Sequence, residues 1–404
     1  MKILYLTSMY PYDKNESSGI FVIKRIEILQ KNDIDLKVLA LVLKHNYFVR
    51  KLLKLSDIAI ERTSKKYNYI DFIISIPSLG TYFGSKGKYY QRIAELFLEK
   101  ISSKYHLGDF DLIHAHFVQG AGHTAYLLNK LFNIPYIVTA HGSDIHTNPL
   151  KDNYTKKITI EILNNSCLNI FVSNYLLNAA KTLGYTSCNY KVLYNGYSKE
   201  DFYIIEKSLA RKNLFRYKKG NYIVGYVGNL LKIKGVHLLP YIFKEISKNL
   251  NNVQFLIVGD GPLMGYLKKM CEKFSLDVIF TGIISHKDLK YMYNSMDVLV
   301  LPSFKEGLSC VAIEAQACGI PVIGSNAGGL PEILSFNKKY NRIIPLEEDH
   351  RKFIKNFAQC VLEILGSSVN PEEISQNIAH LEWEKIVKEE ISIYKNLTGG
   401  FVNK

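Results

Sequence analysis

The chain has 404 residues, which is too long for one hydrophobic core and predicts two domains. Hydrophobic residues make up 47% of it and charged residues 22%, a balance that excludes disordered, collagen-like and low-complexity proteins. The formal net charge of +14 comes entirely from residues 1–250, a basic part that suits nucleic acid, anionic lipid or a phosphorylated substrate.

Short apolar runs alternate with longer segments of helical periodicity along the chain. In the first half the runs lie at 2–6, 35–41, 72–76, 111–115, 135–140 and 168–173. In the second half they lie at 221–228, 253–259, 278–282, 297–302 and 321–325. Continuous apolar strands are typical of parallel sheets covered on both faces. Their alternation with helices predicts an α/β protein of two doubly wound, Rossmann-like domains.

A polar, basic segment between the two series predicts the domain boundary. We place an N-terminal Rossmann-like domain at 1–200, a linker at 201–220 and a C-terminal Rossmann-like domain at 221–375. The remaining residues, 376–404, hold no strand pattern, and the spacing of apolar residues in 381–397 predicts a C-terminal helix. We expect this helix to pack back on the N-terminal domain.

Cysteines and apolar runs bear on the compartment. Six cysteines without a C-x-x-C pair give no sign of a disulfide framework or a zinc site, which favours a reducing cytosol. No apolar run reaches the ~18 residues of a membrane-spanning helix, and the N-terminus has the pattern of a buried strand rather than an export signal. We therefore expect a cytoplasmic protein.

The clearest motif follows the strand at 297–302, and ligands of open α/β sheets bind beyond such strand ends. Glu306 falls in the loop that leaves this strand, and Glu314 lies about two turns into the following helix. Exposed amides at the helix start would attract a phosphate or a sugar hydroxyl, and they belong to Gly307, Leu308 and Ser309. Ordinary acids at the start of a helix are the alternative interpretation.

Two further turns of the second half carry glycines. GNLLKIKG (228–235) holds Asn229 and Lys234, and a lysine at a helix start can pair with phosphate oxygens, although such lysines are usually solvated. GDGPLMG (259–265) begins at Gly259 and is similar to a dinucleotide fingerprint. Its G-x-G-x-x-x-G spacing, and the lack of a carboxylate after the next strand, argue against a nicotinamide enzyme. The glycines would still let the backbone approach a ligand.

Polar side chains also end two strands of the first half. TAHGSD holds His141 and Asp144, and IHAHF holds His114 and His116. Polar residues at adjacent strand ends can meet in one cleft, although a single histidine is more often structural than catalytic. Because residues along a strand alternate between its faces, we expect no metal site at the H-x-H pair.

Two other motif classes are weighed and set aside. The D-x-D pairs Asp33–Asp35 and Asp109–Asp111 have the spacing of metal-dependent sugar-nucleotide enzymes, but both precede strands, so we predict charged turns. No G-K-[S/T] sequence occurs, which argues against a P-loop enzyme or a helicase.

Taken in order, these motifs resemble the retaining, GT-B-fold glycosyltransferases of family 4 over essentially the full length. In the first half the resemblance rests on the turn at 10–21, DLIHAHF, HGSD, Val172-Ser173 and Asn195-Gly196. In the second half it rests on G-N-L-x-x-x-K-G, VGDGP, E-G-L-S-C-V-A-I-E-A, P-V-I-G, GGLPE and the W-E of the terminal helix. Within the family, HAHF with HGSD looks most like enzymes of bacterial cell-surface polysaccharide assembly, such as teichuronic acid or capsule synthesis.

The resemblance implies a nucleotide-sugar donor on the C-terminal domain, with the reaction in a cleft between the domains. It implies ribose hydroxyls for Glu314, the diphosphate for Lys234, and the donor sugar for Glu306 with the amides after it. In this family retention is explained by same-face attack, in which the leaving phosphate helps to deprotonate the acceptor. No metal or other cofactor is implied.

The resemblance also implies roles for the N-terminal domain, which would hold a glycan or an undecaprenyl-linked acceptor. His141 would reach the sugar as a catalytic residue, and Gly19 would let the N-terminal turn approach the diphosphate. His116 and Asp144 would lie on the acceptor side. The clear departure is Asn229, which stands where the family usually has an arginine and carries no charge.

Two other functions stay open. One is a nucleotide-sugar isomerase or hydrolase of the same fold, and the other is a non-catalytic basic protein that binds RNA or an anionic membrane. For the favoured glycosyltransferase no nucleic-acid partner is expected.

Residues 44–66 predict a membrane contact. Apolar residues recur there at helical spacing beside a basic group, namely Phe48, Leu52, Leu55 and Ala59 beside Arg50, Lys51 and Lys54. This pattern is typical of an interfacial helix, so we expect a peripheral protein at the inner face of the plasma membrane. A surface helix packed on the sheet is the alternative.

Overall fold

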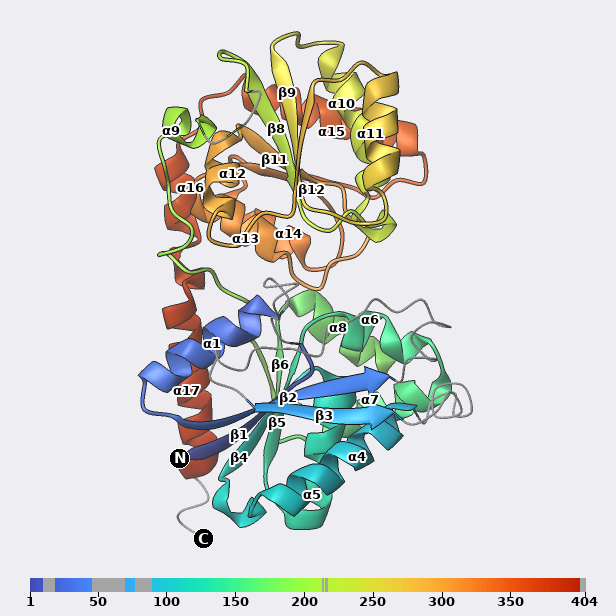
Figure 1. The fold of residues 1–404 in the computed structure, drawn as a ribbon, viewed down its shortest axis with the longest axis vertical. Coiled ribbons are helices and arrows are strands. Elements are labelled where there is room, and N and C mark those ends of the chain that lie inside the picture. Colours follow the sequence, from blue (N-terminus) through green and yellow to red (C-terminus); the bar gives the residue numbers. More distant parts are fainter. Residues whose placement is uncertain (10–18, 46–69, 77–88, 213, 215–216, 400–404) are drawn as a thin grey trace. The chain divides into compact units, whose positions relative to one another are not determined.

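The computed structural model describes residues 1–9, 19–45, 70–76, 89–212, 214 and 217–399. It divides the chain into two compact units. Unit 1 comprises Met1–Tyr194 together with Trp383–Lys404, and unit 2 comprises Asn195–Glu382. Each unit is a parallel sheet with helices packed against it (Figure 1).

Within its described residues, unit 1 holds a seven-stranded parallel sheet in the order β3-β2-β1-β4-β5-β6-β7. The strands are β1 (Lys2–Thr7), β2 (Asp35–His45), β3 (Ile70–Ile76), β4 (Leu112–His116), β5 (Tyr136–Ala140), β6 (Leu168–Phe171) and β7 (Tyr190–Val192). All residues of β4 and β5 are buried, as continuous apolar runs predict for central strands of a covered sheet. The register pairs Thr7 with His116 and His116 with Thr139.

The helices of unit 1 connect its strands and pack on its sheet. They are α1 (Ile20–Lys31), α4 (Tyr89–Lys104), α5 (His123–Phe132), α6 (Ser143–His146), α7 (Asn153–Asn165), α8 (Asn174–Leu183) and α17 (Trp383–Gly399). The terminal helix α17 belongs to this unit and packs along α1. Figure 1 shows α17 in red beside α1 in blue, so the two ends of the chain meet on one sheet.

Unit 2 holds a six-stranded parallel sheet within its described residues, in the order β10-β9-β8-β11-β12-β13. The strands are β8 (Tyr222–Val227), β9 (Val253–Val258), β10 (Val278–Gly282), β11 (Val298–Leu301), β12 (Val322–Ser325) and β13 (Arg342–Ile344). The helices are α9 (Lys207–Arg211), α10 (Leu239–Ser247), α11 (Met264–Lys273), α12 (Leu289–Ser295), α13 (Cys310–Ala317), α14 (Leu330–Leu334), α15 (His350–Leu365) and α16 (Pro371–Asn377).

Both sheets have the Rossmann order, so the predicted pair of doubly wound domains is confirmed. In such a sheet the chain changes direction between its first and fourth strands, and loops there part to leave a crevice at the carboxyl ends. The change falls between β1 and β4 in unit 1 and between β8 and β11 in unit 2. The loops after these strands carry most of the predicted site residues.

The observed boundaries differ from the predicted ones. The units divide at Tyr194 and Asn195 rather than at residue 200, and the segment predicted as a linker holds α9 and belongs to unit 2. The terminal helix begins at Trp383 rather than at 376, because α16 and a short 3-10 helix (Ala379–Leu381) precede it. In the segment predicted to contact a membrane, residues 46–66 lie outside the described part of the chain.

Candidate functional site

In unit 2 the loops that follow β8 and β11 are joined to each other. The amide of Phe304 donates to the carbonyl of Ile233 at 2.9 Å. Gly235 has a φ of 69°, and a Cβ atom there would lie 1.8 Å from the Pro302 carbonyl oxygen. Only glycine fits this contact, which brings the loop after β8, with Lys234, against the loop after β11, with Glu306.

Lys234 and Glu306 meet where these two loops touch. The Lys234 ammonium lies 2.8 Å from each Glu306 carboxylate oxygen, and the Ser303 hydroxyl donates to the same carboxylate at 2.9 Å. The Glu306 side chain is 8% exposed and that of Lys234 is 29% exposed. Two residues predicted separately for the diphosphate and the sugar thus form one ion pair.

Glu314 lies in the second turn of α13. One of its oxygens accepts a hydrogen bond from the Tyr293 hydroxyl at 2.7 Å, and the other lies 3.4 Å from His286 Nε2. Burial and the nearby Glu314 carboxylate raise the pKa of Tyr293, so the phenol stays protonated and keeps donating. Neither partner could be predicted from the sequence, because α12 and the loop after β10 supply them.

The three residues between Glu306 and α13 form the start of that helix. Ser309 caps it, since its hydroxyl accepts from the Ala312 amide, and it is buried together with Leu308. Gly307 precedes them in the chain. The predicted amide-bearing turn is therefore present, but the Ser309 hydroxyl is occupied within the helix.

The glycine turn after β9 has a packing role. Gly259 has a φ of 127°, and a Cβ there would lie 2.1 Å from the Gly228 carbonyl oxygen. Glycine at this position lets the loop after β9 approach the loop after β8. Asn229, in the neighbouring loop, is exposed, and its carbonyl accepts from the Tyr226 hydroxyl at 3.1 Å.

In unit 1 the HGSD turn is held by Asp144. Its carboxylate accepts from the amides of Val118, His141 and Gly142, the last at 2.7 Å, and the residue is 1% exposed. Burial raises the pKa of Asp144, although these amides act in the opposite direction. The backbone amides hold the carboxylate in place and shape the turn, and Asp144, which was predicted on the acceptor side, also lines a cavity of unit 1.

His141 is held between aromatic rings and bonded to His116. His116 Nδ1 lies 2.8 Å from His141 Nε2, and the rings of Phe21 and Phe117 lie 4.6 and 4.7 Å from the His141 ring centre. His116, which was predicted on the acceptor side, is fully buried and is bonded to His141. Gly19, the other predicted residue of this unit, caps α1 in a left-handed conformation with a φ of 69°.

His114 and His116 lie on the same face of β4, so the expectation that they point to opposite faces was wrong. Residues two apart on a strand share a face, and the rings of His114 and His116 lie 4.5 Å apart. His114 is instead bonded to the Tyr394 hydroxyl at 2.6 Å and to the Thr139 hydroxyl at 2.8 Å. Within the described ranges no group of three or more His, Cys, Asp or Glu side chains is arranged to hold a metal ion.

A buried polar network lies beside His114 in unit 1. Arg25 of α1 pairs with Glu390 of α17, and Tyr394 donates to the same carboxylate. Burial alone would raise the pKa of Glu390, but Arg25 and the hydrogen bonds from His114 and Tyr394 lower it to about 2. The sequence missed this network because its members are separated by up to 365 positions.

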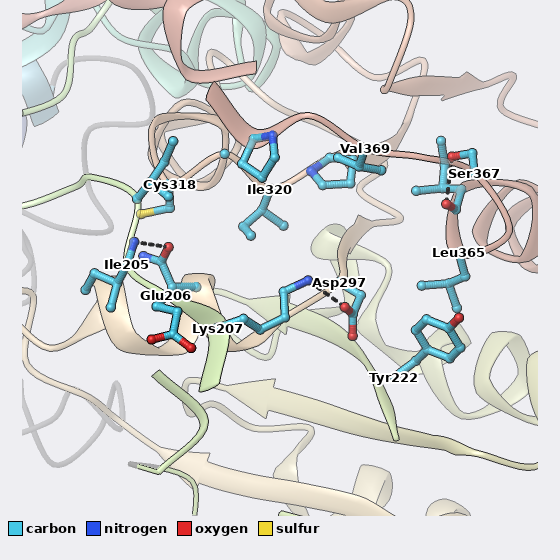
Figure 2. Close-up of a pocket in the computed structure, with 16 residues that line it drawn as sticks. Ile205, Glu206, Lys207, Tyr222, Asp297, Cys318, Ile320, Leu365, Ser367 and Val369 are labelled. Carbon is cyan, nitrogen blue, oxygen red and sulfur yellow. Dashed lines mark hydrogen bonds and ion pairs between the residues drawn. The ribbon is translucent and has the colours of Figure 1, made fainter. Parts of the chain in front are cut away.

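Each unit also contains a cavity. One of about 290 Å³ lies at the carboxyl ends of β1, β2 and β4 in unit 1, and its walls include Met9, Phe117 and Gln119. The other, of about 380 Å³, lies at the amino ends of β8, β11 and β12 in unit 2, and its walls include Tyr222, Asp297 and Ile320 (Figure 2). In Figure 2 Lys207 points to Asp297, and its ammonium nitrogen lies 2.6 Å from a carboxylate oxygen of Asp297. None of the predicted site residues lines this second cavity.

Two remaining expectations concern charged turns and membrane spans. Asp109 and Asp111 bond to Lys2 at the amino end of β1, as a charged turn predicts. Among the helices of the described residues, none combines the length and apolar character that crossing a bilayer requires.

Comparison with known proteins places these features in a family. The model of Glycosyltransferase Family 4 matches residues 60–201, and that of Glycosyl transferases group 1 matches 209–363. TuaC of Bacillus subtilis, named for teichuronic acid biosynthesis, is 29% identical over 85% of each chain. An uncharacterized glycosyltransferase of Methanocaldococcus jannaschii is 31% identical over 71% of this chain and 76% of its own.

A solved structure shares the fold. HepE of Anabaena, in complex with UDP, superposes with a TM-score of 0.70 at 20% identity over 98% of this chain and all of its own. The matched models span both units, and the match to the Methanocaldococcus glycosyltransferase covers most of both chains. The chain therefore belongs to the family 4 glycosyltransferases of GT-B fold.

Proposed function

We propose that this glycosyltransferase is a retaining, metal-independent enzyme that moves a sugar from a nucleotide-sugar donor to a glycan or undecaprenyl-linked acceptor. We assign the donor to unit 2 and the acceptor to unit 1. The pathway we propose is bacterial surface polysaccharide synthesis, which the likeness to TuaC supports. With a lipid-linked acceptor, the enzyme would act at the cytoplasmic face of a membrane.

The Lys234–Glu306 ion pair is the observation that carries this proposal. It lies where β8 and β11 end, which is the ligand position of a Rossmann sheet. Departure of a nucleoside diphosphate builds negative charge on its oxygens, and a fixed ammonium lowers the barrier by stabilising that charge. Glu306 holds the ammonium in place before the donor arrives, and its carboxylate is suited to accept sugar hydroxyls.

Glu314 provides the second support. A carboxylate held by a buried phenol presents a fixed acceptor, and vicinal ribose hydroxyls are donors that would match it. The complex of HepE with UDP supports a uridine diphosphate as one candidate leaving group. We assign the catalytic roles to Glu306 and to His141, which we place at the transferred sugar.

The test is a transfer assay with radiolabelled UDP-, GDP- and TDP-sugars, each with and without a bacterial lipid extract. We expect label to move from one donor into an extractable or polymeric product. Lys234→Met should abolish transfer, whereas Lys232→Met, two positions away, should retain most of it. Release of free sugar alone would indicate a hydrolase, and no turnover with any donor would contradict the proposal.

A further inference from the structure

The two histidines of unit 1 form a pair with one nitrogen of each ring left over. His116 Nδ1 and His141 Nε2 share a hydrogen bond of 2.8 Å. His116 Nε2 and His141 Nδ1 are both buried and have no hydrogen-bond partner among the described residues. A buried polar nitrogen without a partner costs free energy, so its presence calls for an explanation. For His141 Nδ1, a bound substrate is the natural partner.

Burial favours the neutral form of both rings. Burial lowers the pKa of His116 well below its ordinary value, and neighbouring His114 and His141 lower it further. Burial lowers the pKa of His141 in the same way, with a contribution from Arg25. Each neutral imidazole carries one N–H, so the pair has two arrangements. Either His116 donates to His141, or His141 donates to His116.

The two arrangements differ in which ring bears an unsatisfied N–H. If His141 donated, His116 would carry an N–H on Nε2, in a residue that is 0% exposed. If His116 donates, the N–H without a partner is on His141 Nδ1, in a residue that keeps partial exposure. Each arrangement leaves one buried N–H without a partner, but only the N–H of the partly exposed His141 could be satisfied by a molecule bound from solvent, which favours donation by His116.

The surroundings fix the His141 ring in this orientation. Phe21 and Phe117 contact it, with ring centres 4.6 and 4.7 Å from its own. Phe117 has a φ of 74°, a conformation that is strained for a bulky residue and that is retained at functional sites. The imidazoles of His116 and His141 are inclined by only 23° with centres 5.0 Å apart, so they lie edge to edge, as the hydrogen bond between their nitrogens requires.

We propose that His116 is a positioning residue that donates from Nδ1 to His141 Nε2 and so presents His141 Nδ1–H as a neutral donor to a substrate oxygen. This inference rests on the proposed function only for the identity of that substrate, a sugar or phosphate oxygen of the glycosyl transfer. His141 then acts by donating a hydrogen bond, and its Nδ1 does not take a proton from the acceptor.

The tautomer can be read without any activity measurement. Long-range ¹H–¹⁵N spectra of the full chain labelled at histidine distinguish Nδ1–H from Nε2–H, and the His141 signals are those lost in His141→Asn. We expect the Nδ1–H tautomer at neutral pH in the wild-type protein. An Nε2–H tautomer of His141 would overturn the proposal, whether or not transfer is observed.

Two substitutions test the positioning role through turnover. His116→Asn keeps an N–H near the place of Nδ1, whereas His116→Leu removes it. We expect His116→Leu to lower kcat about tenfold with KM for the donor unchanged, and His116→Asn to restore most of the loss. His123→Asn is the matched control, because His123 is also buried with an unpartnered Nδ1 but has no contact with His141.

The outcomes separate the two proposals. Equal losses in His116→Asn and His116→Leu would contradict positioning through this hydrogen bond. Absence of transfer by the wild-type protein with every donor would contradict the proposed function, while the spectrum would still decide the tautomer. If His116→Leu fails to fold, the wild-type spectrum alone remains decisive.

Discussion

Lys234 and Glu306 hold each other in place in unit 2. The ammonium lies 2.8 Å from each carboxylate oxygen, because β8 and β11 are neighbours in the sheet and the loops that follow them touch. Glu314 is held by the Tyr293 hydroxyl at 2.7 Å. These contacts join segments that are distant in the sequence, so the sequence predicted Glu314 but neither Tyr293 nor His286.

Substitution of the two glutamates should separate chemistry from donor binding. Glu314→Gln should raise the donor Kd, because it removes charge from the assigned ribose acceptor. Glu306→Gln should mainly lower kcat, because it disturbs the sugar contact and the ammonium of Lys234. Loss of one charged hydrogen bond costs about 1.5–3 kcal/mol, or roughly 10- to 150-fold. Steady-state kinetics and titration calorimetry measure both effects, and wild-type values in either variant would refute its role.

Restoring the usual arginine should strengthen donor binding. Asn229 is exposed in the loop after β8, so Asn229→Arg adds a charge without burying one. A guanidinium suits phosphate oxygens, and we expect UDP or GDP to bind several-fold more tightly. Asn249→Arg, which adds the same charge to an exposed position beyond α10, is the control. Equal affinities in the two variants would show that residue 229 is not near the diphosphate.

Among the elements, the terminal helix α17 was predicted for its periodicity but not for its function. Its apolar residues indicated a packed helix, and its acids have the spacing of surface charges. The structure buries Glu390 completely, because Arg25 from α1 compensates its charge. Short edge strands escaped prediction for another reason, since β7 and β13 are three residues long and lack a continuous apolar run.

The buried ion pair of α17 should be a major determinant of the stability of unit 1. Glu390→Gln leaves the Arg25 guanidinium buried without its charge partner, and such a loss costs about 3–5 kcal/mol. Glu389→Gln is a matched control, because Glu389 is 53% exposed and lies 3.8 Å from Lys191. Exposed pairs contribute about 0–1 kcal/mol. Denaturant unfolding should therefore show a much lower midpoint for Glu390→Gln than for Glu389→Gln. Similar midpoints of the two variants would contradict a stabilising role of the buried ion pair.

For the whole molecule, the sequence predicted the two Rossmann-like domains because buried parallel strands leave continuous apolar runs. It placed the unit boundary at residue 200 rather than between Tyr194 and Asn195, because no local change of pattern marks that position. The basic composition of residues 1–250 did not predict the histidines of unit 1 whose pKa values are lowered. Within the described residues of this unit, burial lowers the pKa of four histidines, namely His114, His116, His123 and the partly exposed His141.

These histidines should make unit 1 sensitive to acid. Their pKa values are lower in the folded state than in the unfolded chain, so the unfolded chain takes up protons first as the pH falls below about 6.5. For His123, whose pKa is lowered to about 4, the loss between pH 7.5 and 5.5 is about 1 kcal/mol. Thermal unfolding of His123→Asn should show a smaller decrease in Tm over this range. If the Tm of His123→Asn and that of the wild-type protein fell equally with pH, His123 would not be a buried, neutral histidine.

The stereochemistry of transfer in the presence of EDTA tests the proposed enzyme as a whole. With the donor identified, NMR of the isolated product gives the anomeric configuration of the new bond. We predict the configuration of the donor and a rate unchanged by EDTA, because in the proposed mechanism Lys234 and backbone amides stabilise the charge of the leaving diphosphate. An inverted product, or transfer that stops in EDTA and returns with Mn²⁺ or Mg²⁺, would contradict the account.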